Sequence, residues 1–289
     1  MLFENKKELL LLLLPALLVL GLLALYPIFS VSYHAFGSDD LAGSGSRFVG
    51  LENFRQLFDD LFFRAAIGNT LRFTLVASCA QVLLGLGLAL LFYRHFPGRR
   101  LALPILIYPM MLSTLVCSSI WRFWYHYDFG LLNHALMALG LPSQAWLFNP
   151  DLALYAIALV DTWQWTPMSF LIILAGLQSI PKEIGEAAMV DGARGWRSLW
   201  YITLPLIKNA ILLAFLLRAI DTFKLFDKVY VMTGGGPGNT TETLSMFVYK
   251  YGFRFFDLGM ASASAMVMLA ISLAMTLCYA RQALRGGKP

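Results

Sequence analysis

The sequence predicts an all-α integral membrane protein with six transmembrane helices. Of its 289 residues, 58% are hydrophobic and only 13% are charged, and the mean hydropathy is +0.67. A typical soluble domain has about 45–50% apolar and about 25% charged residues. The charged residues also collect between long apolar runs, as expected when a bilayer surrounds the runs and water surrounds the segments between them.

Six apolar runs have the length that a membrane span requires. A helix needs about 20 mostly apolar residues to cross about 30 Å of hydrocarbon. The six runs are Leu9–Tyr33, Ile67–Tyr93, Leu101–Phe123, Leu152–Leu177, Leu206–Phe226 and Leu258–Ala280. Because two lysines precede the first run, a cleaved signal peptide is its alternative interpretation. However, the run is longer than the apolar part of a usual signal peptide, so we expect an uncleaved helix.

The distribution of Lys and Arg predicts that both termini lie in the cytoplasm. With the N-terminus inside, the cytoplasmic segments contain twelve Lys and Arg in 55 residues, and these segments are 1–8, 94–100, 178–208 and 281–289. The outer segments contain eight in 100 residues, and these are 34–66, 122–152 and 222–257. Positive residues favour the cytoplasmic side of a membrane. The same residues border the spans and form no continuous stripe, so we expect no nucleic-acid partner.

The long cytoplasmic segment between the fourth and fifth runs, residues 178–205, has an unusual pattern. Pro181 suits the first turn of a helix, and Glu183 suits the same positive end. Gly192 then favours a break in this helix, and a short amphipathic stretch, Trp196–Ile202, follows. The pattern predicts two short helices that meet at a glycine elbow. Such a knob can bind another protein, or its Trp and Tyr side chains can lie among lipid headgroups.

A resemblance to a known family favours the protein-binding interpretation. Glu186-Ala187-Ala188, Asp191-Gly192-Ala193 and Ile202-Thr203-Leu204-Pro205 resemble the EAA loop of bacterial ABC-importer permeases. The resemblance implies a type I ABC importer permease-like bundle whose loop forms coupling helices that insert into a cleft of an ATPase subunit. The implied coupling residues are Glu186, Ala187, Ala188, Asp191, Gly192, Ala193, Leu204 and Pro205.

Three further segments are similar to the carbohydrate-uptake branch of this family. They are Trp163–Pro181, Asp221–Leu244 and Phe48–Phe54. The pattern looks like the first permease subunit of maltose, multiple-sugar and glycerol-phosphate systems. By this resemblance, residues 1–66 form the N-terminal transmembrane helix and first periplasmic loop, and residues 67–289 form the permease core. The expected location is the bacterial inner membrane, with several passes.

This chain has no phosphate loop of the G-x-x-x-x-G-K-[ST] type, so ATP hydrolysis must come from another subunit. The resemblance implies which partners these are. We expect no catalytic residues and no metal site here, and ATP and Mg on partner ATPase subunits. The implied partners are a second permease subunit, two copies of a cytoplasmic P-loop ATPase, and a periplasmic or lipid-anchored solute-binding protein. The expected function is transport of a sugar or related polyol. An ion-coupled secondary transporter with ionisable residues at mid-membrane remains the alternative.

Polar residues inside the runs are candidates for the solute path, because such residues are costly in a membrane and often functional. The candidates are Asp161, Trp163, Gln164, Asp221, Ser262 and Ser264. Asp161 and Gln164 are three residues apart and share a helix face, which we expect to point into the bundle. Asp221 has the same spacing from Arg218, and we expect these two to pair with each other. For each candidate, helix packing is the alternative role.

Overall fold

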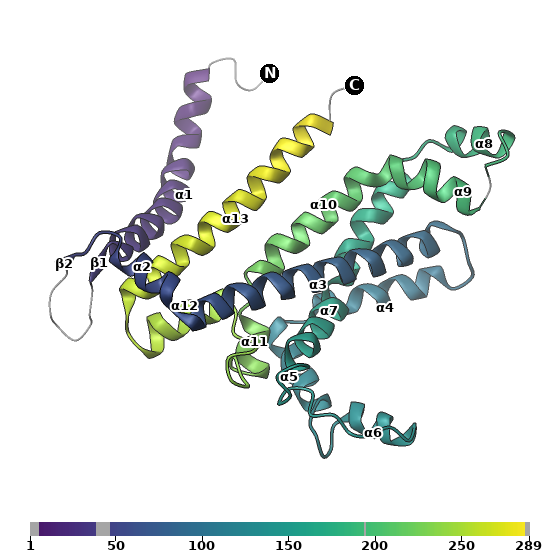
Figure 1. The fold of residues 1–289 in the computed structure, drawn as a ribbon. Helices are drawn as coiled ribbons and strands as arrows, with labels where there is room; N and C mark the ends of the chain where they lie inside the picture. Colours follow the sequence, from purple (N-terminus) through teal and green to yellow (C-terminus); the bar gives the residue numbers. More distant parts are fainter. Residues whose placement is uncertain (1–5, 39–46, 194, 287–289) are drawn as a thin grey trace. The chain divides into compact units, whose positions relative to one another are not determined.

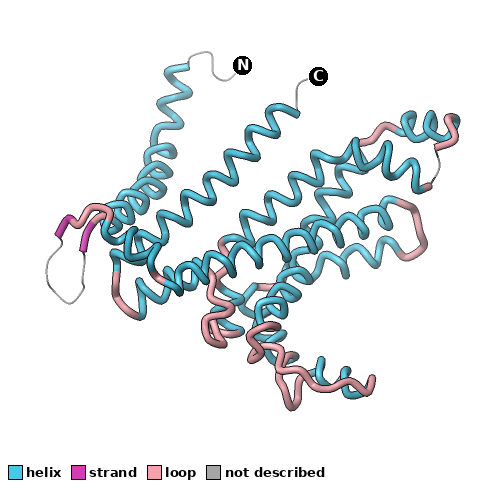
Figure 2. Tube along the Cα trace, viewed as in Figure 1, coloured by secondary structure: helices cyan, strands magenta, loops and turns pink. Residues whose placement is uncertain are grey.

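The computed structural model describes residues 6–38, 47–193 and 195–286 and is mostly helical, with loops between the helices (Figure 2). The chain divides into two compact units. Unit 1 contains residues 1–63 and 247–270, and unit 2 contains residues 64–246 and 271–289. Because two long helices belong partly to each unit, the division falls within continuous helices. The predicted boundary after residue 66 stays a prediction.

Unit 1 begins with the first span and ends in a short antiparallel hairpin and helices. Its elements are α1 (Lys6–Ala35), β1 (Gly37–Ser38), β2 (Arg47–Phe48), α2 (Glu52–Asp59), the end of α12 (Leu244–Tyr249), the π-helical turn η2 (Lys250–Arg254) and the first part of α13 (Leu258–Gly286). The side-chain amide of Asn53 donates to the carbonyl oxygens of Ala35 and Gly37, at 2.9 and 2.8 Å. A Cβ atom at Gly259 would lie 2.9 Å from this amide, so the small residue permits close packing.

Unit 2 contains the remaining helices. They are α3 (Leu61–Tyr93), α4 (Arg99–Met111), α5 (Thr114–Trp124), α6 (Leu131–Ala138), α7 (Ala153–Gln178), α8 (Lys182–Val190), α9 (Trp196–Ser198), η1 (Leu199–Thr203), α10 (Leu204–Phe223) and α11 (Asp227–Met232). Helices α3, α4, α7 and α10 run alongside one another, and α8 and α9 extend beyond one end of α7 and α10 (Figure 1).

Five of the six predicted spans are confirmed as long apolar helices, and the third is not a single helix. In its place α4 and α5 are bent by 96° at a short break, so the described residues contain five candidate spans, or six if the bent pair counts as one. Leu112 and Ser113 adopt extended backbone at the break. The freed carbonyl of Leu112 accepts a hydrogen bond from Gln164 at 2.9 Å, which is how a broken helix is tolerated inside a membrane protein.

The fifth span also differs from the prediction. We expected a separate short helix at Trp196–Ile202 and a span that begins near Leu206, but Trp196–Phe223 is one continuous helical stretch. The π-helical turn η1 ends at Thr203, two residues before Pro205. Proline has no N–H to give to the preceding turn, and a wider turn changes the hydrogen-bond register there without ending the helix.

The core of unit 2 changes in character along its helices. An apolar cluster near the coupling-loop end joins α3, α7 and α10, with the rings of Phe92 and Phe170 5.2 Å apart. The backbones come very close at Gly176, where a Cβ atom would lie 2.6 Å from the Cβ of Ala210. Toward the other end α3 buries polar side chains among apolar ones such as Phe73 and Ala77; the polar ones are Asn69, Thr70, Thr74, Ser78 and Gln81. Unit 2 therefore has an apolar end and an end where polar side chains are buried among apolar ones.

Candidate functional site

The loop between α7 and α10 folds as the predicted knob with a glycine elbow. Helix α8 ends in a Schellman motif, in which the N–H groups of Gly192 and Ala193 donate to the carbonyl oxygens of Met189 and Ala188, at 3.2 and 2.9 Å. Gly192 has φ +78° and Gly195 has φ +57°, values that L side chains rarely adopt. The two glycines therefore turn the chain from α8 into α9.

Most of the predicted coupling residues lie on the surface of this knob. Ala188 is buried beneath it, and Ala193 and Leu204 are half-buried. The exposed members are Glu186, Ala187, Asp191, Gly192 and Pro205. Around them the knob also exposes apolar side chains, with Val190 at 87% and Trp196 at 72% of full exposure. An exposed apolar patch of this kind marks a surface that contacts a protein or a membrane.

The end of unit 2 that buries polar side chains contains a cluster of charges around Asp161 of α7. One carboxylate oxygen accepts from Nζ of Lys228 at 2.6 Å, and the other accepts from the side-chain amide of Gln81 at 2.7 Å. A guanidinium nitrogen of Arg218 lies 3.8 Å from the second oxygen. Asp161, Lys228 and Arg218 are all at most 4% exposed. The carboxylate therefore connects α3, α7, α10 and α11.

Arg218 of α10 extends the same cluster toward the surface. Its Nε donates to Gln81 Oε1 at 2.7 Å, and its Nη1 donates to Asp221 at 2.9 Å. The expected pairing of Arg218 with Asp221 is thus confirmed. The guanidinium also lies 4.7 Å from the ring centre of Trp165, a cation–π geometry. Two carboxylates and two cations make the cluster neutral overall, which lowers the penalty for burying charge.

The sequence reasoning missed two members of this cluster, Lys228 and Gln81. Lys228 was counted among the outer-loop cations, whereas it is 1% exposed. The available signal was its position beside the apolar run Val229–Met232, since a lysine among apolar residues needs a buried partner. For Gln81 the signal was the row Thr70, Thr74, Ser78 and Gln81, whose spacing of three and four residues places them on one helix face.

The other candidate path residues are distributed differently. Gln164 is fully buried and reaches the break between α4 and α5, which confirms the face that it was expected to share with Asp161. Trp163 packs against Trp121 of α5, with ring centres 5.6 Å apart. Ser262 and Ser264 are buried in unit 1. The structure therefore brings Asp161 and Asp221 into one cluster through Arg218, whereas Gln164, Trp163 and the two serines contact other partners or lie elsewhere.

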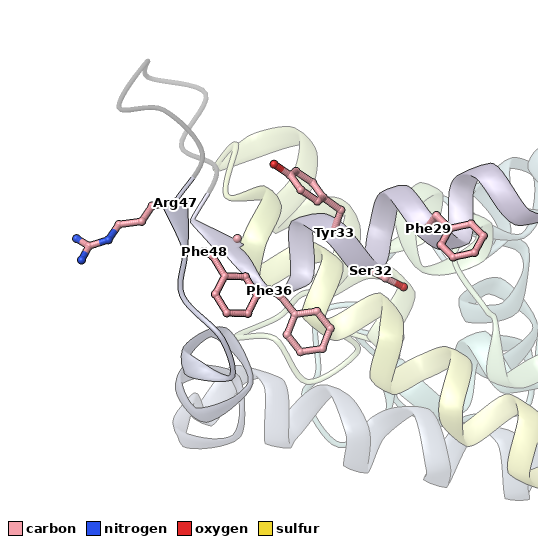
Figure 3. Close-up of a pocket in the computed structure, with 7 residues that line it drawn as sticks. Phe29, Ser32, Tyr33, Phe36, Arg47 and Phe48 are labelled. Atoms are coloured by element: carbon pink, nitrogen blue, oxygen red, sulfur yellow. The ribbon is translucent and has the colours of Figure 1, made fainter.

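Two cavities lie outside the charge cluster. The first, of about 700 Å³, is in unit 1 at the junction of α1 and the hairpin. Its lining is mainly aromatic, from Phe29, Tyr33, Phe36 and Phe48, and the charged end of Arg47 points away from these rings (Figure 3). The second, of about 310 Å³, is in unit 2 between α3, the turn before α7 and the glycine-rich segment after α11. Its lining is rich in polar side chains.

The chain resembles known transport proteins over most of its length. Residues 81–285 match the family described as the binding-protein-dependent transport system inner membrane component. The sulfoquinovosyl glycerol transport system permease of Agrobacterium fabrum is 40% identical over 242 residues, covering 82% of this chain and 77% of that protein. The trehalose/maltose transport system permease of Thermococcus litoralis is 35% identical over 236 residues, covering 82% and 80%.

Solved structures show the same fold. A bacterial ABC transporter involved in the import of the acidic polysaccharide alginate has a chain that matches with a TM-score of 0.85 and 22% identity, covering 98% of this chain and 97% of that one. These matches support an ABC importer permease and not the ion-coupled secondary transporter. The chain therefore belongs to the family of inner-membrane components of binding-protein-dependent transport systems.

Proposed function

We propose that this chain is one of two permease subunits through which an ABC importer moves a sugar or related polyol into the cell. In this proposal two copies of a P-loop ATPase bind ATP and Mg, and a periplasmic or lipid-anchored protein delivers the solute. The relatives support the solute class, since their names specify sulfoquinovosyl glycerol, trehalose or maltose, and glycerol 3-phosphate. These solutes all carry two or more hydroxyl groups.

The observation that carries the proposal is the exposed knob at residues 178–205. The exposed residues Glu186 and Gly192 lie near the C-terminal end of α8, and backbone hydrogen bonds fix this end. The chain continues from the second helix of the knob, through Trp196–Phe223, without a break. A rigid displacement of the knob by a partner would therefore move α10, and with it the buried cluster around Arg218. Such rigid-body motion is a usual way to change the side on which a path is open.

A reconstituted importer tests this role. The complex contains this chain with the proposed second permease, ATPase and solute-binding protein, in proteoliposomes with ATP inside. We expect Val190→Glu to reduce uptake of the transported sugar at least about tenfold, since a charge would replace an apolar side chain that a partner must bury. ATP hydrolysis stimulated by the binding protein should fall in parallel.

Gly185→Ala is the matched control. Gly185 lies on the same helix, about 140° around it from Val190 at 100° per residue, and an added Cβ would meet nothing within 4 Å. Uptake should stay close to that of the unchanged protein. Full uptake by Val190→Glu would show that the knob does not bind the ATPase. If Val190→Glu released the knob from the membrane surface while transport stayed unchanged, the lipid-headgroup interpretation would be favoured.

A further inference from the structure

We propose that the cavity of about 310 Å³ in unit 2 is a second solute site, which takes one sugar ring before the solute enters the buried path. This inference rests on the proposed function and adds a binding site to it. The cavity lies where α3 and α7 begin and where the glycine-rich segment follows α11. Helix α7 has 26 residues, so this end is about 39 Å from the coupling loop. In the predicted topology it faces outward.

Asn69 fixes one wall of the cavity and leaves an acceptor beside it. Its Nδ2 donates to the carbonyl oxygens of Asn239 and Glu242, both at 3.1 Å. These bonds use the two amide hydrogens. Within the described chain no hydrogen bond to Oδ1 of Asn69 occurs, and this atom is not among the fully buried ones. The amide therefore holds the glycine-rich segment and keeps one oxygen for a ligand.

The glycine-rich segment is held in place by its own bonds. Gly238 and Asn239 have φ values of +55° and +63°, which turn the backbone sharply beside the cavity. The hydroxyl groups of Thr240 and Thr241 donate to the carbonyl oxygens of Pro237 and Gly236, at 2.8 and 2.6 Å. The wall is therefore formed before a ligand arrives, which lowers the entropy that binding would otherwise lose.

The charged lining favours a neutral hydroxylated ligand. Arg72 and Asp151 both line the cavity and are exposed. Neither makes an ion pair or hydrogen bond through its charged group with any residue that the structure describes. A guanidinium donates to hydroxyl oxygens and a carboxylate accepts from hydroxyl hydrogens, so adjacent hydroxyls of one sugar ring can use both. An anion would gain from Arg72 but be repelled by Asp151.

The size and the aromatic side chain agree with one ring. Ligand cavities range from about 300 to 1,000 Å³, and this one is at the small end. Tyr155 adds an aromatic face and a hydroxyl to the lining, and 53% of its surface is exposed. Asp161 follows Tyr155 by six residues on α7, which is about 9 Å along the helix. A solute bound here would therefore lie close to the buried cluster, on its outer side.

Saturation-transfer NMR on the purified importer complex, without the solute-binding protein, tests the proposal. The probes are glucose, maltose and trehalose in turn, with glycerol 3-phosphate as the anionic comparison. We expect ring-proton signals from at least one neutral probe. Arg72→Gln and Asp151→Asn should each weaken binding of that probe about tenfold, the effect of losing one charge-assisted hydrogen bond. Arg100→Gln removes an exposed arginine elsewhere in unit 2 and should leave binding unchanged.

Three results would overturn the site. One is no signal from any neutral probe, and another is a signal that Arg72→Gln and Asp151→Asn leave intact. The third is that both variants raise the concentration of solute-binding protein needed for half-maximal ATP hydrolysis, while probe binding stays the same. The cavity would then receive a segment of that protein. In all three cases the proposed function would stand as long as the complex with the unchanged chain takes up sugar. Failure of the second site and failure of the proposed function are therefore distinguishable.

Discussion

At the residue scale, the contact of Asp161 with Lys228 joins two charged side chains that are only 3% and 1% exposed. A buried pair loses the hydration of both ions, so its net contribution to stability is small. Removal of one partner is different, because the remaining charge stays buried without compensation. Substitution of one member of the pair should therefore cost much stability, even though the intact pair contributes little to it.

We predict that Asp161→Asn destabilises the permease complex by about 3–5 kcal/mol, because Lys228 would lose its carboxylate. The double variant Asp161→Asn with Lys228→Met should lose clearly less stability than the sum of the losses caused by the two single changes. Thermal unfolding of the purified complex in detergent measures all three variants. Additive losses would show that the two side chains do not depend on each other.

A second residue-scale prediction concerns Gly192, at φ +78° in the Schellman motif. An added Cβ meets nothing within 4 Å, so the backbone conformation and not space restricts this position. We expect Gly192→Val to abolish most uptake, since a β-branched residue strongly disfavours positive φ. Gly192→Asn should retain much more, because asparagine is tolerated at such helix ends.

Uptake by the reconstituted importer measures both Gly192 variants, and copurification of the subunits checks that the complex still assembles. Equal uptake by the Val and Asn variants would mean that the turn at the end of α8 does not carry the coupling.

At the element scale, the close approach of α7 and α10 positions the coupling loop between them. The approach depends on Gly176, where a Cβ atom would lie 2.6 Å from the Cβ of Ala210. Small residues at helix contacts allow backbones in a membrane to come this close. Any larger side chain must push the two helices apart near the point where α8 and α9 begin.

We predict that Gly176→Val destabilises the complex by about 1–3 kcal/mol through overpacking and reduces the coupling of ATP hydrolysis to uptake. Gly87→Val is the control, because Gly87 is also in a long helix but is exposed and has no atom within 4 Å of an added Cβ. Thermal unfolding and the ratio of sugar taken up to ATP hydrolysed give the two readouts. A Gly176→Val protein with an unchanged unfolding temperature would contradict the close approach.

Also at the element scale, the bent pair α4 and α5 shows what the apolar pattern could not predict. The run Leu101–Phe123 has the length and hydropathy of a span, and its two prolines, Pro104 and Pro109, do not by themselves specify a 96° bend after Met111. The bend is accommodated by a contact from another helix, in which Gln164 binds the carbonyl of Leu112, 52 residues away. Hydropathy averages over the run, whereas the break is accommodated by a contact between segments that are distant in the sequence.

At the scale of the whole molecule, the topology can be tested directly. The burial of Lys228 removes one cation from the exposed outer segments, which strengthens the difference in positive charge between the two sides. We predict that green fluorescent protein fused after residue 289 fluoresces, and that alkaline phosphatase inserted after Gly140 is active, because the first requires the cytoplasm and the second the periplasm. The reverse pattern of the two reporters would overturn the N-in/C-in assignment.

The sequence by itself determined the membrane environment, five of the helical spans and the resemblance of residues 178–205 to a coupling loop. These features depend on composition and on the spacing of residues near one another in the chain, so local patterns are sufficient to predict them. Only the tertiary structure decided that Lys228 and Gln81 meet Asp161, from 67 and 80 residues away. Only it showed that Asn69 holds the glycine-rich segment 170 residues later. Such contacts depend on how the helices pack, which no short pattern encodes.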